Sequence, residues 1–328
     1  MPTRRGATVS WQFGGTNHMR RAKGVQTEQF LAQRERERVG RVPLIVKAVV
    51  PAAGRGTRLL PATRSQPKEM LPVGRKPTIQ HVVEELAAAG IREVLLISGQ
   101  WKRAIEDHLD RAAGLNDESP EPWMDLQFFH ARQSVPKGLA DAIALAEPFA
   151  AEKPFVVALG DSIVASRSRR PLLKRMIEVH ERHRPAATIA VETVPREAVQ
   201  RYGIVAPKGE ADDVFAIRDI VEKPSPERAP SNLSAAGRYI LEPVIFDAVR
   251  RTKPGIGGEL WLTDALRILL SEGHEILCVK LREGEHRLDI GNFLSYFQAF
   301  AEFSLADPEH GAALRAWMKA RLKKPARK

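Results

Sequence analysis

The sequence is poor in cysteine, in long apolar runs and in paired histidines, and each shortage excludes a class of protein. Cys278 is the single cysteine, so an intramolecular disulfide and a thiolate zinc cluster are both excluded. The nine histidines have no spacing typical of metal ligands. No apolar run approaches the roughly 18 residues of a membrane-spanning helix, and the first residues do not resemble a secretory signal peptide. We therefore expect a cytoplasmic protein with no membrane partner.

Acidic residues are scarce at the two ends of the chain but not between them. The formal net charge is +11. Residues 1–41 hold nine Lys or Arg against three Glu, and residues 315–328 hold seven Lys or Arg and no acid. This leaves 35 basic and 37 acidic residues in the nearly neutral body. A basic tail can bind nucleic acid electrostatically, but a solvated tail is the simpler interpretation, and we expect no nucleic-acid partner.

Strand and helix patterns alternate from residue 44 onward. This rhythm predicts an α/β fold in which a mixed, mostly parallel, Rossmann-like sheet is covered by helices. Residues 202–224 are expected to form a hairpin that ends at a proline. The expected strands are 44–50, 93–98, 126–131, 155–159 and 188–193. The expected helices are 78–90, 101–109, 139–146, 172–180, 243–252 and 263–273, with a largely helical region at 293–322.

A glycine-containing loop, "PAAGRGTRLLPATRSQPKEMLP" (51–72), follows the first expected strand. It lacks the third glycine of a dinucleotide fingerprint, because Leu59 stands there, and it lacks the Gly-Lys-Ser/Thr end of a P-loop. Its two glycines let backbone N–H groups approach a ligand, and Arg58 and Lys68 add two cations. These features suit phosphate groups, although a glycine turn with surface cations explains the loop alone equally well.

The surrounding string, "KAVVPAAGRGTRLLPATRSQPKEMLPVGRKPTIQHVVEELAAAGI" (47–91), resembles the start of bacterial UTP–glucose-1-phosphate uridylyltransferases. These enzymes belong to the sugar-phosphate nucleotidylyltransferases. The resemblance continues in the family's order through "RQSVPKGLADAI", "ALGDSIV", "RYGIV", "VEKP", "APSNLSAAGRYIL", "GGELWLTDAL" and "RLDIGN". It covers roughly residues 47–299 and implies a fold of the nucleotide-diphospho-sugar transferase type. The "PKEMLP", "GRY" and "LTDAL" blocks look like the uridylyl rather than the thymidylyl branch.

The resemblance implies transfer of a uridylyl group from UTP to glucose 1-phosphate, giving UDP-glucose and pyrophosphate. It also implies Mg²⁺ as cofactor and assembly into a homo-oligomer. Because the attacking sugar phosphate is already an anion, catalysis would consist of positioning and charge neutralisation. Three alternatives stay open: another sugar 1-phosphate, dTTP as the nucleotide, or a catalytically weak homologue that binds nucleotide sugars and regulates a pathway.

The resemblance assigns a role to thirteen residues. The catalytic cations would be Arg58, Lys68 and Lys223. The nucleotide would be bound by Ala53, Gly54, Gly56, Thr57, Gln133 and Gly138. The sugar would contact Gly203 and Glu222, and the metal ligands would be Asp161 and Asp289.

Several of these residues also have a purely structural interpretation. Asp161 could cap a turn after a strand, and Asp289 could form an Asx-turn. Lys68 and Glu69 could form a local ion pair of little energetic value. Gln133 could be a solvated amide, and the Glu222-Lys223 pair could be an exposed strand end.

The chain departs from the family's pattern at four positions. Arg64 replaces a common Lys, and Asp141 replaces a common His. Ser162 stands where many members have a second acid after Asp161, which lowers the charge at the metal but leaves a hydroxyl that could bond a metal-bound water. Trp261 replaces a common Gln and bears on contacts with the sugar or between subunits.

The chain is expected to divide into three segments. Residues 1–43 would be a basic, disordered extension with one helix near 28–38. Residues 44–300 would form the catalytic domain, and residues 301–328 a helical, basic C-terminal tail.

Overall fold

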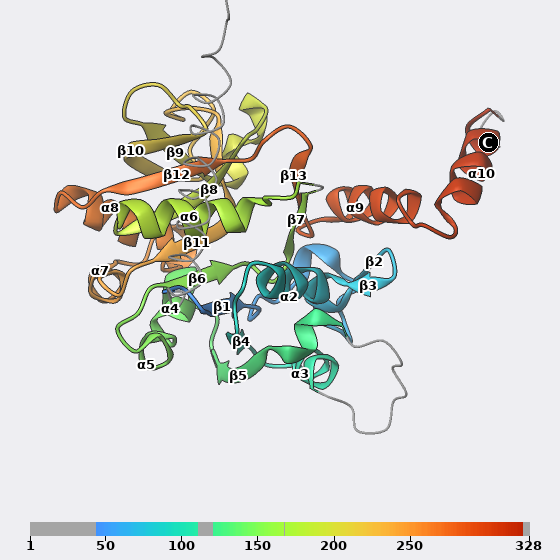
Figure 1. The fold of residues 1–328 in the computed structure, drawn as a ribbon, viewed down its shortest axis with the longest axis horizontal. Coiled ribbons are helices and arrows are strands. Elements are labelled where there is room, and N and C mark those ends of the chain that lie inside the picture. Colours follow the sequence, from blue (N-terminus) through green and yellow to red (C-terminus); the bar gives the residue numbers. More distant parts are fainter. Residues whose placement is uncertain (1–43, 111–120, 167, 324–328) are drawn as a thin grey trace, which may run out of the picture. The chain divides into compact units, whose positions relative to one another are not determined.

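The computed structural model describes residues 44–110, 121–166 and 168–323 (Figure 1). The extension expected at 1–43, with its helix near 28–38, lies outside these residues, as do the last five residues of the expected tail. Among the described residues, no helix is both long and apolar enough to cross a membrane.

A nine-stranded mixed sheet forms the centre of the fold, in the order β5-β4-β1-β6-β11-β8-β12-β10-β9. The strands β5, β4, β1 and β6 run parallel, as do β8 and β12. The strand β11 is antiparallel to both its neighbours, and β10 pairs antiparallel with β9 and β12. This arrangement confirms the predicted α/β fold. The bounds are β1 Lys47–Pro51, β4 Glu93–Ser98, β5 Gln127–Arg132, β6 Phe155–Ala158, β8 Ala187–Thr193, β9 Gly203–Pro207, β10 Val214–Glu222, β11 Leu233–Leu241 and β12 Ile276–Lys280.

Helices cover both faces of the sheet, and the alternation along β1 shows why. Ala48 and Val50 point into one core, which contains residues of α2, α3 and α6, whereas Val49 points into a second core with residues of α4, α7 and α8. Successive side chains of a strand face opposite sides, so a strand between two helical layers must be apolar throughout. The helices are α2 Thr78–Ala88, α3 Arg103–Leu109, α4 Leu139–Ala144, α5 Glu147–Ala150, α6 Leu172–His183, α7 Ile245–Arg251 and α8 Leu262–Ser271.

The strand β11 was not predicted, although every one of its nine residues is buried. Its sequence, LSAAGRYIL, includes Arg238, a fully buried cation. The guanidinium donates to Glu85 of α2 at 2.7 Å and to the backbone carbonyls of Gly237 and Ser162. A buried charge is tolerated when it is paired and hydrogen-bonded, so these bonds let a polar residue occupy the middle of the sheet.

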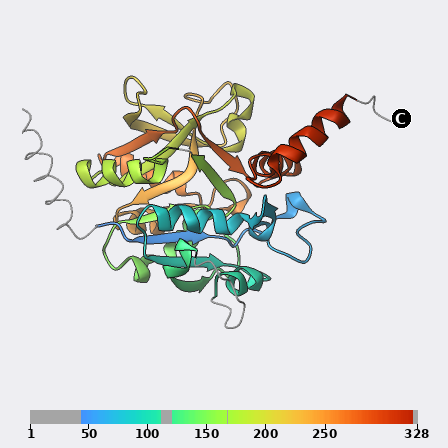
Figure 2. The ribbon, with the colours of Figure 1, turned by 45° about the vertical axis from the view of Figure 1, so that its right-hand side comes forward.

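Two small sheets and the C-terminal helices complete the described fold. The strands β7 (Ser162–Ser166) and β13 (Glu285–Asp289) pair antiparallel, as do β2 (Pro72–Val73) and β3 (Lys76–Pro77). Leu59, Val73, Ile163 and Ala299 form a third core under α9 (Phe293–Leu305). The last helix, α10 (Gly311–Leu322), contacts α9 and then extends away from it (Figure 2). Short 3₁₀ helices are Thr57–Leu59, Lys68–Met70, Pro122–Asp125, Arg196–Arg201 and Ile256–Gly258.

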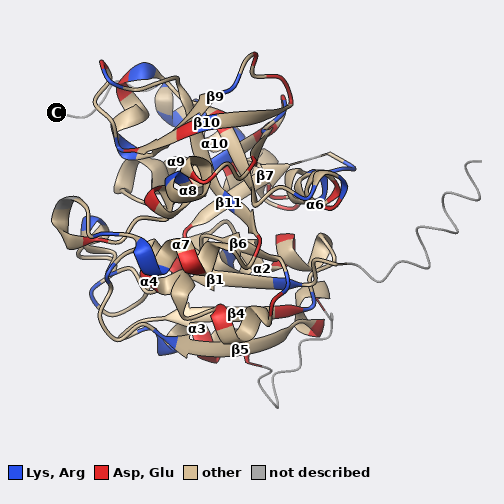
Figure 3. Cartoon of the chain, turned by 90° about the vertical axis from the view of Figure 1, so that its left-hand side faces the viewer, with Lys and Arg blue, Asp and Glu red and all other residues tan. Residues whose placement is uncertain are grey.

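Charges of both signs are interspersed over the described surface. Figure 3 shows Asp and Glu beside Lys and Arg on most elements facing the viewer. This distribution agrees with the nearly neutral body of the sequence.

Candidate active site

A cavity of about 750 Å³ lies where several strands of the sheet end. It is bordered by the loops after β1 and β6, the ends of β10 and β13, and the start of α8. Ligands of open α/β sheets bind at such strand ends. Ten of the thirteen predicted site residues line this cavity: Gly54, Gly56, Thr57, Arg58, Lys68, Asp161, Gly203, Glu222, Lys223 and Asp289.

The glycine loop presents backbone donors to the cavity. Gly56 adopts a left-handed conformation with φ 66°, and its carbonyl accepts a 2.8 Å hydrogen bond from the Thr63 hydroxyl. Within the described chain, the N–H groups of residues 54–58 donate to no backbone carbonyl. Gly54 lies next to Lys68, since a Cβ there would make an ordinary van der Waals contact with the Lys68 ammonium at 3.5 Å. Free N–H groups beside a cation form a site for phosphate oxygens.

Lys68 and Asp161 form an ion pair across the cavity floor, in which the Lys68 ammonium donates to Asp161 Oδ2. Burial opposes both charges. Nevertheless, Asp161 and Glu69 raise the pKa of the Lys68 ammonium above its ordinary value, and Lys68 holds the pKa of Asp161 below its ordinary value. Both groups therefore stay charged.

Glu69 does not pair with its neighbour Lys68, so the local ion pair considered above is wrong. Its carboxylate accepts a 2.6 Å hydrogen bond from Lys102, and both side chains are buried. Burial raises the pKa of Glu69, while Lys102 and Lys68 oppose the rise. This second pair anchors the 3₁₀ turn that carries Lys68.

Asp161 and Asp289 are brought together by neighbouring strands. Asp289 pairs in register with Ser162, and the N–H of Ile290 donates to the Asp161 carbonyl at 2.9 Å. Burial raises the pKa of Asp289, and the nearby Asp161 carboxylate raises it further. Two carboxylates that repel each other in one cavity could hold a divalent cation. The described residues include no group of three or more His, Cys, Asp or Glu that could do so, so the two carboxylates would need ligands from the substrate or solvent.

Ser162 is not at the cavity surface. Its side chain is buried, and a Cβ at Gly237 would lie 3.2 Å from its hydroxyl oxygen. Ser162 lies beside β11 rather than among the lining residues, and among the described residues its hydroxyl has no hydrogen-bond partner. A contact between this hydroxyl and a metal-bound water stays a prediction.

Glu222 and Lys223 form the wall at the other end of the cavity. Glu222 ends β10, and its Oε2 accepts a 3.0 Å hydrogen bond from the Thr263 hydroxyl of α8. Lys223 has φ 45°, a left-handed value that costs a non-glycine residue free energy. Its ammonium lies 3.4 Å from Glu222 Oε1 and 5.6 Å from the ring centre of Trp261. This strained backbone holds a cation at the cavity edge, beside an aromatic ring.

Three predicted residues do not line the cavity: Ala53, Gln133 and Gly138. Ala53 is buried beneath the glycine loop, and Gln133 is only 5% exposed, so it is not a solvated amide. Gly138 has φ 109°, and a Cβ there would lie 2.4 Å from the Leu260 carbonyl oxygen. The turn from Gln133 to Gly138 still borders the cavity, because Pro136, Lys137 and Leu139 line it.

Several lining residues were missed by the sequence analysis. Arg287 donates to Glu192 at 2.6 Å, and its guanidinium lies 4.2 Å from the ring centre of Tyr202. Arg201 lies 3.8 Å from Asp289. The "RYGIV" and "RLDIGN" blocks contain these residues, so the signal was present, but sequence alone does not show that the two blocks meet.

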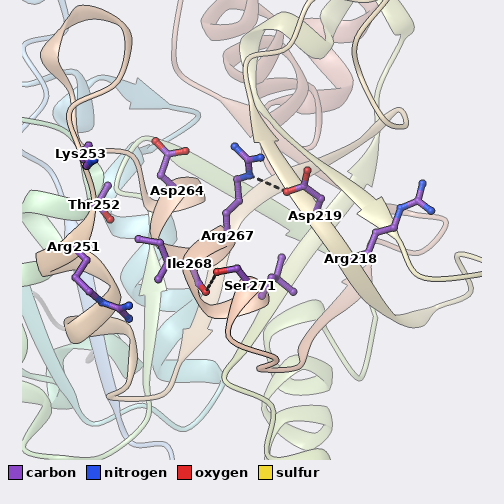
Figure 4. Close-up of a pocket in the computed structure, with 10 residues that line it drawn as sticks. Arg218, Asp219, Arg251, Thr252, Lys253, Asp264, Arg267, Ile268 and Ser271 are labelled. Atoms are coloured by element: carbon purple, nitrogen blue, oxygen red, sulfur yellow. Dashed lines mark hydrogen bonds and ion pairs between the residues drawn. The ribbon is translucent and has the colours of Figure 1, made fainter.

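A second groove, of about 820 Å³, contains none of the predicted site residues. It lies between β10, the end of α7 and α8 (Figure 4). Arg267 donates to Asp219 at 2.9 Å, and Arg251 pairs with Asp247 and Glu272. The groove contains neither the glycine loop nor the two carboxylates, Asp161 and Asp289, that line the cavity at the strand ends.

Comparisons with known proteins agree on one family. Residues 47–304 match the protein family described as Nucleotidyl transferase. The chain is 42% identical over 290 residues to UTP–glucose-1-phosphate uridylyltransferase YngB of Bacillus subtilis, covering 85% of this chain and 96% of that protein. It is 41% identical over 278 residues to a UTP–glucose-1-phosphate uridylyltransferase of Streptococcus pyogenes, covering 80% and 90%.

Solved structures give the same result. A UDP-glucose pyrophosphorylase complexed with UDP-glucose matches with a TM-score of 0.75 and 36% identity, over 80% of this chain and all of that one. A UTP-bound UGPase from Acinetobacter baumannii matches with a TM-score of 0.75 and 33% identity, over 84% of this chain and 99% of that one.

Proposed function

The chain belongs to the nucleotidyl transferase family, and from this premise we propose that it transfers a uridylyl group from UTP to glucose 1-phosphate. The products are UDP-glucose and pyrophosphate. One observation carries the proposal. A glycine loop with free N–H donors, the carboxylates of Asp161 and Asp289, and a separate wall that contains Lys223 all line a single cavity. Two anionic substrates that must react with each other need such an arrangement.

The nucleotide end of the cavity is the glycine loop. The N–H groups of residues 54–58, with Arg58 and Lys68, would neutralise the triphosphate. Gly54 and Gly56 keep side chains away from this approach, and Thr57 adds a hydroxyl. We assign the uracil to the side of the loop where Ala53, Gln133 and Gly138 lie.

The acceptor end is the wall formed by Glu222 and Lys223. Lys223 would hold the phosphate of glucose 1-phosphate, and Glu222 would accept hydrogen bonds from sugar hydroxyls. Gly203 packs against Thr263, since a Cβ there would lie 2.7 Å from the Thr263 methyl, and we propose that its backbone contacts the sugar. The ring of Trp261 adds an apolar surface, so we propose that it contributes to the choice of sugar.

The reaction is an in-line displacement. A phosphate oxygen of the sugar phosphate attacks the α-phosphorus of UTP, and the bond from that phosphorus to the oxygen bridging the β-phosphorus breaks. Pyrophosphate leaves with that bonding pair. No general base is needed, because the nucleophile is an anion, and cations near the phosphates would stabilise the transition state.

Asp161 and Asp289 fit a divalent cation, and we propose Mg²⁺. The fit rests on the two adjacent carboxylates. Burial and, after it, the neighbouring Asp161 carboxylate raise the pKa of Asp289, and a cation would relieve the repulsion between the two carboxylates. When bound, Mg²⁺ would neutralise phosphate charge and orient the α-phosphate. The chain's own part is to hold both carboxylates in register through β7 and β13.

We further propose that residues 44–300 are the catalytic domain and that α9, which begins within it, and α10 serve assembly into a homo-oligomer. Leu294, Phe297 and Trp317 are 67%, 59% and 60% exposed. Apolar side chains gathered on neighbouring helices commonly mark protein contacts. We propose no nucleic-acid partner, because the body between the two basic ends holds 35 basic and 37 acidic residues, and a cytoplasmic location, because the substrates are metabolites such as UTP.

The test is pyrophosphate release by the purified chain with UTP and glucose 1-phosphate. We expect rapid release that needs both substrates and Mg²⁺ and stops in excess EDTA. A panel with dTTP and other sugar 1-phosphates then measures specificity. If UTP and UDP-glucose bind but no pyrophosphate forms, the chain is a regulatory homologue and the proposed activity is wrong.

A further inference from the structure

The amide of Gln133 is held by two acceptors in a buried position. Its Nε2 donates to Asp141 Oδ2 at 2.6 Å and to the Gly138 carbonyl at 3.2 Å. The side chain is only 5% exposed, and its backbone N–H donates to the Ser98 carbonyl at 2.9 Å. Both ends of this residue are therefore anchored to the protein.

These contacts determine which way the amide faces. A carboxylate and a backbone carbonyl only accept hydrogen bonds, and the amide nitrogen has two hydrogens to donate. Turning the amide over would place its carbonyl oxygen against two acceptors, losing two hydrogen bonds and creating repulsion. The Oε1 atom must therefore lie at the opposite end, where it can only accept.

Asp141 is suited to this role by its place in α4. It lies in the first turn of the helix, three residues after Gly138 at the N-cap. The Gly138 carbonyl, which also accepts the first helical hydrogen bond from Ala142 at 3.2 Å, is fixed by the same turn.

The segment that holds Gln133 is continuous with the cavity wall. Lys137 and Leu139 line the cavity, and the backbone of Leu260 bonds to this turn twice. Its N–H donates to the Lys137 carbonyl at 2.7 Å, and its carbonyl accepts from Ala140 at 3.0 Å. The turn that orients Gln133 is therefore held by backbone hydrogen bonds and forms part of the cavity wall at the nucleotide end.

We propose that Asp141 is a positioning residue that selects the base by fixing the Gln133 amide with its oxygen as acceptor. Uracil has an N–H donor at N3, which this oxygen can accept, whereas cytosine has an unprotonated N3 that needs a donor. The inference rests on the proposed function, which places Gln133 at the base. Asp141 itself touches neither substrate; it acts through Gln133.

The experiment compares kcat and KM for UTP and CTP, with glucose 1-phosphate, in the full-length chain and three variants. Asp141→Ala frees the amide to turn, and we expect the UTP-to-CTP ratio of kcat/KM to fall about tenfold, through a higher KM for UTP. Asp141→Asn keeps an oxygen acceptor and should retain most of the preference. Gln133→Ala should raise the KM for UTP more than either change.

Matched measurements separate this role from a loss of structure. The KM for glucose 1-phosphate and the thermal midpoint should be similar in Asp141→Ala and Asp141→Asn. If Asp141→Ala does not fold, Asp141→Leu, which fills a similar volume without an acceptor, replaces it.

The inference is overturned if the UTP-to-CTP ratio of kcat/KM is unchanged in Asp141→Ala or Asp141→Leu. It is also overturned if this ratio falls as far in Asp141→Asn as in Asp141→Ala. Neither outcome affects the enzyme's activity. A normal KM for UTP in Gln133→Ala overturns it by removing Gln133 from the base. Failure of the unaltered chain to form UDP-glucose would instead refute the proposed function.

Discussion

Two consecutive residues, Lys68 and Glu69, reach into different parts of the molecule. Lys68 pairs with Asp161 in the cavity, and Glu69 pairs with Lys102 beneath it. Removing one partner of a buried pair leaves an uncompensated charge, which costs far more than the pair contributes. The position of Lys68, the proposed catalytic cation, is thus fixed by a neighbouring residue that does not line the cavity.

Replacing Lys102 by Met should therefore destabilise the protein by about 3 kcal/mol near neutral pH. Burial already raises the pKa of Glu69 above its unfolded value, and loss of Lys102 strengthens that shift. A carboxyl whose folded pKa is raised stabilises the fold at low pH and loses that contribution as pH rises. The deficit relative to wild type should be larger at pH 8 than at pH 5, measured by denaturant unfolding.

The double variant Lys102→Met, Glu69→Gln is the control, because it removes both charges. It should recover much of the lost stability and lose the extra pH dependence. A deficit of the same size at both pH values would contradict a role for the Glu69 charge.

At Lys223, removing the side-chain charge should affect turnover much more than stability. Lys223→Ala should lower kcat/KM for glucose 1-phosphate about 10³-fold by removing the cation at the acceptor phosphate. The thermal midpoint should change little, because the side chain is partly exposed and its backbone strain remains. Steady-state kinetics with each substrate varied provide the measurement, and Lys223→Arg, which keeps the charge, should retain more activity. Near-normal turnover in the Ala variant would remove Lys223 from the site.

At the scale of elements, the acceptor end depends on a contact between a helix and a strand. The Thr263 hydroxyl at the start of α8 donates to Glu222 at the end of β10. Thr263→Val keeps the methyl group against Gly203 but removes the donor. We expect a KM for glucose 1-phosphate raised about tenfold, an unchanged KM for UTP, and about 1 kcal/mol of lost stability.

A change confined to the KM for UTP would show that this contact belongs to the other end of the cavity. The comparison of both KM values in one set of assays therefore tests the division of the cavity into two ends.

Most elements with a clear pattern were predicted, but β12 was missed although its sequence, ILCVK, is a short buried apolar run. The parallel strands β1, β4, β5 and β6 and their helices follow runs of apolar residues that end at glycine or polar residues. The strand β11 is made largely of small residues and contains a buried arginine, so its place at the centre of the sheet depends on partners distant in sequence. The strand β13, EHRLD, is mostly polar and is held by pairing with β7.

At the candidate site, individual residues were predicted, but the contacts between them were not. The family resemblance named ten residues that line the cavity, because their motifs are contiguous in sequence. It did not indicate that Lys68 contacts Asp161 or that Gln133 contacts Asp141, since these contacts join segments 93 and 8 residues apart. Side-chain pairing of this kind depends on how loops pack, which local patterns do not specify.

For the whole molecule, the exposed apolar side chains of α9 and α10 are the feature most open to test. If they form a contact between copies of the chain, the double variant Leu294→Glu, Phe297→Glu should shift the protein toward smaller species. Both side chains are more than half exposed, so the change should leave the fold intact. Sedimentation velocity gives the assembly state, and circular dichroism checks the fold.

A matched variant, Leu294→Ala, Phe297→Ala, removes bulk without adding charge and should have a weaker effect. If the Glu variant sediments like the wild-type chain, subunits do not meet through this face.

The ion pair between Lys68 and Asp161 also determines how the cavity would fill. The carboxylate already has a cation, contributed by the chain itself. A metal ion arriving alone would have to displace the ammonium and leave it without an anion in a half-buried place. A nucleotide triphosphate offers the displaced ammonium new oxygens to bind. Occupation of the cavity is thus an ion exchange rather than an addition, and it is least costly when metal and nucleotide enter as one complex.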